Sequence, residues 1–175
     1  MSMNHVRVPL VQPGTNSQLK NIENKITAER GRISLLYQVL LNSEPIATGW
    51  EQMLTAVRNK TDIPPSLREM MILRVAVLNC ASFEFEAHIP HALKAGVSQE
   101  KIDHIKLPEP DQHFTEQERL LLQLTDHMTR DVKVPEHIMT TLSAHYSAKE
   151  IVEIVATIAA YNMVSRFLVA LNISH

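Results

Sequence analysis

The sequence predicts an all-α protein. Between its prolines and capping residues, hydrophobic residues recur at the three- and four-residue spacing of amphipathic helices. No segment shows the sustained alternation of a half-buried strand, and no Asn-Gly or Asp-Gly hairpin turn occurs. The chain also has only four glycines. These observations favour helices throughout.

Prolines and capping residues divide the chain into expected elements. The segment up to about Ser17 contains Pro9, Pro13 and Gly14, which is typical of an extended arm. A first helical region, 19–41, is expected to break near Gly31. Further helices are expected over 43–58, 66–80, 82–95, 98–106, 115–130, from Pro135 onwards, and over 147–171.

Several of these helices carry specific start and stop signals. Ser82 is a candidate N-cap, and Gly96 is a candidate left-handed exit residue. Capping-box patterns are formed by Thr115 with Glu118, and by Ser147 with Glu150. We therefore expect an extended N-terminal arm over 1–17 and one all-α domain over 18–175, with about seven to eight helices.

Composition excludes several classes of function. The 175-residue chain has a formal net charge of -2 with acids and bases interspersed, so it has no basic face for nucleic acid. A single cysteine rules out an intramolecular disulfide, and the N-terminus lacks the apolar core of a signal peptide, which favours a cytoplasmic protein. The uncharged stretch 154–165 is shorter than the roughly 20 residues that span a membrane. No membrane association is expected.

The chemical signals concentrate in the segment REMMILRVAVLNCASFEFEAHIPHALKAG, residues 68–96. Glu84 and His88 are four residues apart and share a helix face, so a carboxylate can bond the imidazole and raise its basicity. Glu69 lies on the preceding helix and would reach His88 if the two helices pack antiparallel. His88 is then the preferred acid-base group. Two alternatives remain open: Ser66 and Glu69 fit a capping box, and Glu84 with His88 fits a helix-stabilising pair on a solvated face.

A metal site is not expected in this segment. Glu84 and His91 are seven residues apart, about 10.5 Å of helical rise, so they cannot close on one ion together with His88. The other histidines are scattered along the sequence. Cys80 is expected to be a buried structural thiol, because no second cysteine could resolve its oxidised form.

The segment 68–96 and the tail motif YNMVSRFLVALN resemble the carboxymuconolactone decarboxylase family, whose other main branch is the alkylhydroperoxidase D group. The peroxidase motif is a glutamate, eleven residues, a Cys-x-x-Cys pair, and a histidine four positions after the second cysteine. With His88 on that histidine, Glu69 is the motif glutamate, while Ala81 and Glu84 replace the two cysteines. The resemblance is therefore to the branch without the cysteine pair, and it implies a helical bundle of the alkylhydroperoxidase D-like type.

The resemblance implies a cofactor-independent enzyme, a carboxy-lyase acting on a small carboxylated or lactone compound. His88, Glu84 and Glu69 would be catalytic, with neither cofactor nor metal. Cys80, Phe83 and His91 would line the substrate pocket, and Arg74 is the nearest cation for an anionic substrate, although it projects from another helix face than Glu69. Phe85 could also shape the pocket.

Two other functions stay open. An alkylhydroperoxidase-like antioxidant with peroxiredoxin activity is disfavoured, because the sulfur atoms are missing at the motif positions. A non-catalytic oligomeric binding protein is the second alternative. By the resemblance, the partners would be a small-molecule substrate and further copies of the chain in a trimer or hexamer, with a dimer as the alternative. The apolar last helix could supply that contact.

Overall fold

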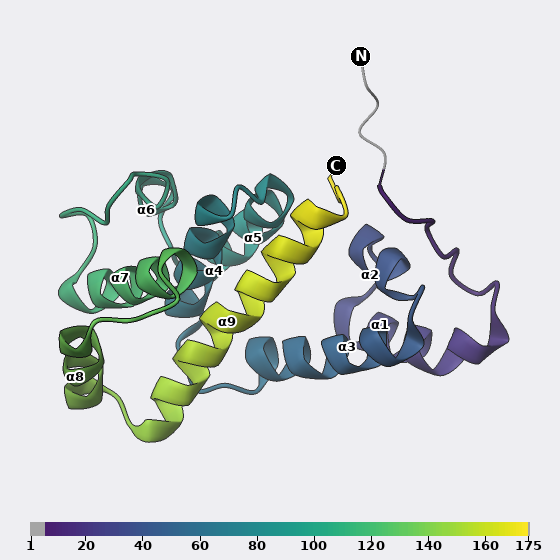
Figure 1. Cartoon of the computed structure of the whole chain (residues 1–175), viewed down its shortest axis with the longest axis horizontal. Helices are drawn as coiled ribbons and strands as arrows, with labels where there is room; N and C mark the ends of the chain where they lie inside the picture. Colours follow the sequence, from purple (N-terminus) through teal and green to yellow (C-terminus); the bar gives the residue numbers. More distant parts are fainter. Residues whose placement is uncertain (1–5, 175) are drawn as a thin grey trace, which may run out of the picture. The chain divides into compact units, whose positions relative to one another are not determined.

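The computed structural model describes residues 6–174, and that range contains helices and no strands. The predicted all-α fold is confirmed (Figure 1). One 3-10 helix and nine α-helices follow each other within the described residues: η1 Ser17–Leu19, α1 Lys20–Arg30, α2 Leu35–Leu40, α3 Glu44–Asn59, α4 Pro65–Leu78, α5 Ser82–Lys94, α6 Gln99–His104, α7 Glu116–Arg130, α8 Glu136–His145 and α9 Ala148–Ala170. The expected break at Gly31 separates α1 from α2, and Gly31 caps α1 with a φ of 78°.

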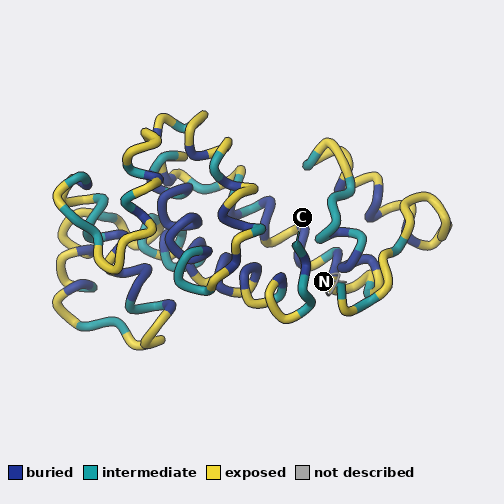
Figure 2. The backbone as a smooth tube through the Cα atoms, turned by 90° about the horizontal axis from the view of Figure 1, so that it is seen from above, coloured by how far each residue is buried: buried dark blue, intermediate teal, exposed yellow. Residues whose placement is uncertain are grey.

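The helices form two compact units. One is built from the chain up to Lys60 together with its end from Ala170, and the other from Thr61–Val169. The expectation of a single domain over 18–175 stays a prediction. In both units the buried residues lie along the inner helix faces and the exposed ones lie mainly on loops and outer faces (Figure 2).

The first unit packs α1 and α2 against α3. Its core contains a polar cluster around Glu51, whose carboxylate accepts hydrogen bonds from Tyr37, from Thr55 at 2.5 Å and from Arg30 at 3.2 Å. Every partner of this fully buried carboxylate is a donor, which offsets the cost of burying its charge.

The N-terminal arm is tied down within this first unit. The backbone N–H of Arg7 donates to the carbonyl of Leu171 at 3.0 Å, and that of Val11 donates to the carbonyl of Gln38 at 3.0 Å. From residue 6 to residue 16 the arm has no helix or strand, but it bends at 7–8 and turns at 13–14, so the extended conformation stays a prediction. Residues 1–5 lie outside the described residues.

The second unit is organised around α4, which packs against α5 and α7 (Figure 1). Pro64 is its N-cap and Pro65 occupies its first turn, where a missing N–H costs nothing. The nine residues buried on α4 include all of 69–76, so the helix is surrounded on every side. A helix without a solvated face belongs in a core.

Capping boxes precede two of the helices, α7 and α9. The Thr115–Glu118 capping box is present, and Ser147 and Glu150 make the reciprocal bonds of a second box before α9. The prediction that Ser82 is an N-cap is wrong: Ala81 precedes the helix and Ser82 is its first residue.

The last helix, α9, is long and apolar enough by length and hydropathy to cross a membrane. Half of its most apolar window is buried against the rest of the chain. It also carries Asn162 and Ser165, which are buried and hydrogen-bonded to other parts of the second unit. This packing is that of a core helix.

Candidate acid-base site

A tight turn joins α4 to α5 and sets the two helices antiparallel. Asn79 ends α4, Cys80 has the left-handed φ of 54°, and Ala81 precedes α5. The Asn79 amide donates to Asn162 Oδ1 at 2.9 Å and to Ser165 Oγ at 2.7 Å. The tail motif on α9 therefore holds this turn in place.

The antiparallel pair brings Glu69, Glu84 and His88 together. His88 Nδ1 lies 2.7 Å from Glu69 Oε2 on α4, and His88 Nε2 lies 3.1 Å from Glu84 Oε1 one turn earlier on α5. Both ring nitrogens thus face carboxylates. We call these three residues the acid-base cluster.

The acid-base cluster is enclosed by the protein. Glu69, Glu84 and His88 are 3%, 6% and 5% exposed, respectively. These values contradict both alternative interpretations of the spacing. Glu84 and His88 do not lie on a solvated face, and Glu69 bonds His88, while the start of α4 has no side-chain cap.

The two carboxylates control the protonation of His88. Burial alone would lower the pKa of His88, but the hydrogen bonds and charges of Glu69 and Glu84 outweigh it and raise the pKa above the usual 6.5. A ring that donates from both nitrogens is an imidazolium. The two carboxylates of the acid-base cluster therefore favour the protonated form of His88.

This raised pKa predicts that stability falls as pH rises. Below about 6.5 the folded and unfolded forms both hold the His88 proton; above it only the folded form does, until the folded pKa is passed. The free energy of unfolding should then decrease by at most about 1.4 kcal/mol per pH unit for this one proton. Urea unfolding from pH 6 upwards should show this slope in wild type and in the exposed-site control His127→Gln, and not in His88→Gln. Equal slopes in all three proteins would contradict the assignment.

Arg68 supplies a cation that the sequence analysis missed. Its Nε lies 3.5 Å from Glu69 Oε1, and its side chain is 14% exposed. The Nε atom is buried and makes no hydrogen bond within the described residues. The available signal was adjacency, since Arg68 directly precedes Glu69. A buried donor beside the acid-base cluster is suited to an anionic ligand.

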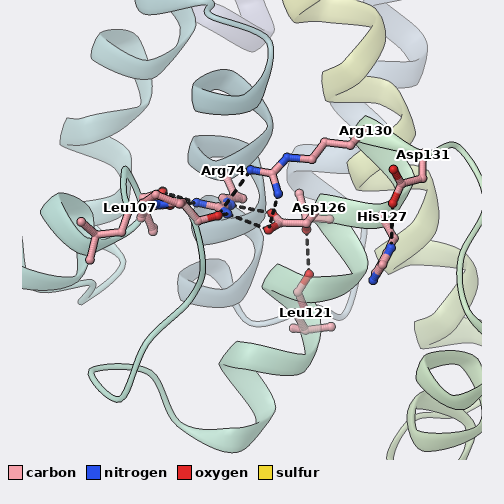
Figure 3. A network of polar contacts seen from close by, with 10 residues as sticks. Arg74, Leu107, Leu121, Asp126, His127, Arg130 and Asp131 are labelled. Atoms are coloured by element: carbon pink, nitrogen blue, oxygen red, sulfur yellow. Dashed lines mark hydrogen bonds and ion pairs between the residues drawn. The ribbon is translucent and has the colours of Figure 1, made fainter.

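Arg74, predicted as the substrate cation, has a different role. Its guanidinium forms a two-pronged pair with Asp126 at 2.5 and 2.6 Å, and donates to the carbonyls of Ile105, Leu107 and Pro108 (Figure 3). All five N–H donors of the side chain are thus used. Arg74 fastens the loop after α6 to α7 and has no donor left for a substrate.

Cys80 is exposed, so the prediction of a buried structural thiol is wrong. The cause is the left-handed turn, which points the residue away from the core. Cys80 does line a pocket of about 380 Å³ together with Phe85 and Lys106, whose Nζ lies 5.3 Å from the centre of the Phe85 ring. The residues lining this pocket do not include Glu69, Glu84 or His88.

The remaining predicted pocket residues lie near His88 or on its helix. The rings of His91 and His88 are 5.4 Å apart, and His91 is exposed, so it lies on the solvent side of the acid-base cluster. Phe83 is half-buried on α5. The structure adds Tyr161 of α9, whose ring stands edge-on to His88 at 5.2 Å. Tyr161 belongs to the tail motif that carried the resemblance.

Comparison with known proteins gives a match to one protein family. Residues 44–127 match the Carboxymuconolactone decarboxylase family. A solved structure of a protein of unknown function from Agrobacterium tumefaciens, whose name refers to the antioxidant defence protein AhpD, is 25% identical to this chain. The alignment covers 78% of this chain and 94% of the Agrobacterium chain, with a TM-score of 0.72. The family match over residues 44–127 and the likeness to this structure support the carboxymuconolactone decarboxylase/AhpD-like superfamily.

Two more comparisons add a sequence relative and a similar fold. The uncharacterized protein YdfG of Bacillus subtilis (strain 168) is 24% identical over 115 residues, which are 65% of this chain and 78% of YdfG. A variant of the debrominase Bmp8, solved with 2,3,4-tribromopyrrole, is 18% identical; it covers 98% of this chain and 92% of that chain, with a TM-score of 0.79. At that identity the likeness to Bmp8 shows the fold alone.

Proposed function

We propose that this protein is a cofactor-independent acid-base enzyme of the carboxymuconolactone decarboxylase type, a carboxy-lyase acting on a small carboxylated or lactone compound. The observation that carries the proposal is the enclosed His88, with both ring nitrogens on carboxylates at 2.7 and 3.1 Å. Such an arrangement places an acid-base group in a site shielded from bulk solvent.

The proposed reaction needs one proton per turnover. The bond between the substrate carbon and its carboxylate breaks, CO₂ leaves, and the electron pair spreads over the conjugated lactone. A proton from His88 then bonds to carbon, and solvent returns a proton to the acid-base cluster. No electron acceptor takes part, so the balance closes with substrate and solvent alone.

The three members of the acid-base cluster would divide the work. Glu69, at the shorter distance, orients His88 and stabilises the imidazolium. Glu84 is the more exposed carboxylate, with 8% of its side chain accessible compared with 4% for Glu69. Glu84 is therefore the route by which the proton passes between His88 and a bound substrate or water. Arg68, beside Glu69, would bind the substrate carboxylate.

The sequence argues against the peroxidase alternative. Cys80 is the only cysteine, and Ala81 and Glu84 occupy the motif positions of the two sulfurs. A thiol-disulfide cycle needs an attacking and a resolving sulfur. Peroxide reduction that is equal in wild type and Cys80→Ser would exclude a thiol mechanism at this residue.

We also propose that the chain forms a homo-oligomer. Val152, Met163 and Val169 of α9 are 66%, 41% and 48% exposed, which leaves apolar surface on this helix. A binding protein without catalysis would share this surface, so the oligomeric state does not distinguish the two functions. Catalysis does.

The test is turnover of a panel of small unsaturated lactone carboxylates in D₂O. We expect release of CO₂ and one solvent-derived deuterium on carbon in the product. Arg68→Met should raise KM about ten- to hundredfold, the equivalent of one charge-assisted hydrogen bond, with a smaller effect on kcat. Lys94→Met, on the exposed surface of α5, is the matched control. No CO₂ release by the folded protein would favour the binding-protein alternative. Release without deuterium in the product would contradict protonation of the carbon from a solvent-exchangeable group.

A further inference from the structure

Two histidines and a glutamate converge outside the acid-base cluster. Glu100 and His104 belong to α6, and His113 lies in the loop that leads to α7. One ligand atom from each lies within 4.8 Å of the others. In the sequence these histidines are scattered, since nine positions and a change from helix to loop separate His104 from His113. The fold of the loop brings them together.

Asp111 orients both imidazoles in the same sense. Its carboxylate lies 2.7 Å from His104 Nδ1 and 3.1 Å from His113 Nδ1, and it accepts the His113 backbone N–H at 3.0 Å. A carboxylate accepts hydrogen bonds, so both Nδ1 atoms carry the hydrogen. The Nε2 atoms are then left with their lone pairs. Metal-binding histidines are oriented in this way by a carboxylate behind them.

The free side of this cluster is electron-rich. His113 Nε2 lies 3.5 Å from Glu100 Oε1, and the two imidazole rings are 3.6 Å apart at 40°. With both Nδ1 atoms protonated, a lone pair of His113 faces a carboxylate. One cation bound by all three ligands would accept the lone pairs of both imidazoles and neutralise the charge of the Glu100 carboxylate.

We propose that Glu100, His104 and His113 bind a divalent transition metal ion. Zn²⁺ is the ion used to test this proposal. Two imidazoles and one carboxylate suit Zn²⁺, while Mg²⁺ and Ca²⁺ prefer oxygen ligands. The side chains of His104, His113 and Glu100 are 26%, 32% and 68% exposed, so a fourth position is open to water or a partner ligand.

The metal ion would fasten α6 to the loop before α7. The start of that loop is already held by Arg74, which binds the carbonyls of Ile105, Leu107 and Pro108. Its later part, which carries Asp111 and His113, would be held by the metal. This site is independent of the proposed acid-base function, because none of its residues belongs to that cluster.

The test is calorimetric titration of the full chain with Zn²⁺, supported by the visible spectrum of the Co²⁺ form. We expect one equivalent per chain. His104→Ala and His113→Ala should each weaken binding at least tenfold, and Asp111→Asn, which leaves the ligands in place, should weaken it about 10- to 100-fold. Zn²⁺ should also raise the unfolding temperature of wild type.

The matched control is His127→Ala. His127 pairs with Asp131 at 2.9 Å on the surface of α7, and the groups of three converging ligands among the described residues do not include it. It should bind Zn²⁺ as wild type does. The proposal is overturned if wild type shows no saturable binding, or if the double variant of His104 and His113 binds one equivalent as tightly as wild type. Circular dichroism checks that each variant is folded.

Discussion

Replacing His88 by alanine should lower kcat about 10²- to 10⁴-fold on any substrate that the protein decarboxylates, which is the range for loss of a general acid-base group. The reason is the position of the ring between Glu69 and Glu84. Its two ring nitrogens lie 2.7 Å from Glu69 Oε2 and 3.1 Å from Glu84 Oε1. KM should change less than kcat, because His88 is asked to act in the transition state.

Two further substitutions separate the roles of the carboxylates. Glu69→Gln keeps an acceptor for Nδ1 but removes the charge that raises the pKa of His88, so the alkaline limb of the pH profile should move to lower pH. Glu84→Gln should lower kcat by interrupting proton transfer. His127→Ala is the control for an exposed histidine. Unchanged kcat in a folded His88→Ala protein would disprove the acid-base role.

Replacing Arg74 by methionine should destabilise the second unit by about 3–5 kcal/mol, the typical cost of breaking a buried ion pair. The substitution leaves Asp126 and three loop carbonyls without their donor. Arg74→Lys should restore only part of this, since an ammonium cannot reproduce five donors in a planar fork. Chemical unfolding followed by circular dichroism measures the change.

Arg130→Met is a closely matched control for this prediction. Arg130 lies 3.5 Å from the same carboxylate of Asp126, but its side chain is 48% exposed, while that of Arg74 is 1% exposed (Figure 3). A solvent-exposed pair contributes less than about 1 kcal/mol. Similar losses of stability in both variants would mean that burial of the Arg74 pair is not what makes it important.

Several features of the site could be predicted from sequence because they depend on local spacing. The i,i+4 relation placed Glu84 beside His88, and the family motif placed Glu69 opposite them. The structure has both contacts: His88 Nδ1 lies 2.7 Å from Glu69 Oε2, and His88 Nε2 lies 3.1 Å from Glu84 Oε1. The capping boxes at Thr115 and Ser147 are equally local, since a cap and its partner are three residues apart.

The errors have one physical cause, the direction in which a side chain leaves its helix. Arg74 was chosen as a substrate cation because it is near Glu69 in the sequence, yet it projects towards Asp126, 52 residues away. Cys80 was expected to be buried, but its φ of 54° turns it outward. Local sequence spacing predicts neither the packing partner of an arginine nor a left-handed backbone conformation at a residue other than glycine.

The sequence by itself determined the helical fold, the absence of a cysteine pair and the choice of Glu69, Glu84 and His88 as candidate residues, because periodicity, caps and a short motif are local properties. The tertiary structure alone decided that this cluster is enclosed, that Arg68 rather than Arg74 accompanies it, and that His104 and His113 meet at Asp111. Those relations depend on which residues the α4–α5 turn and the loop before α7 bring into contact. Such contacts are set by packing across the whole unit.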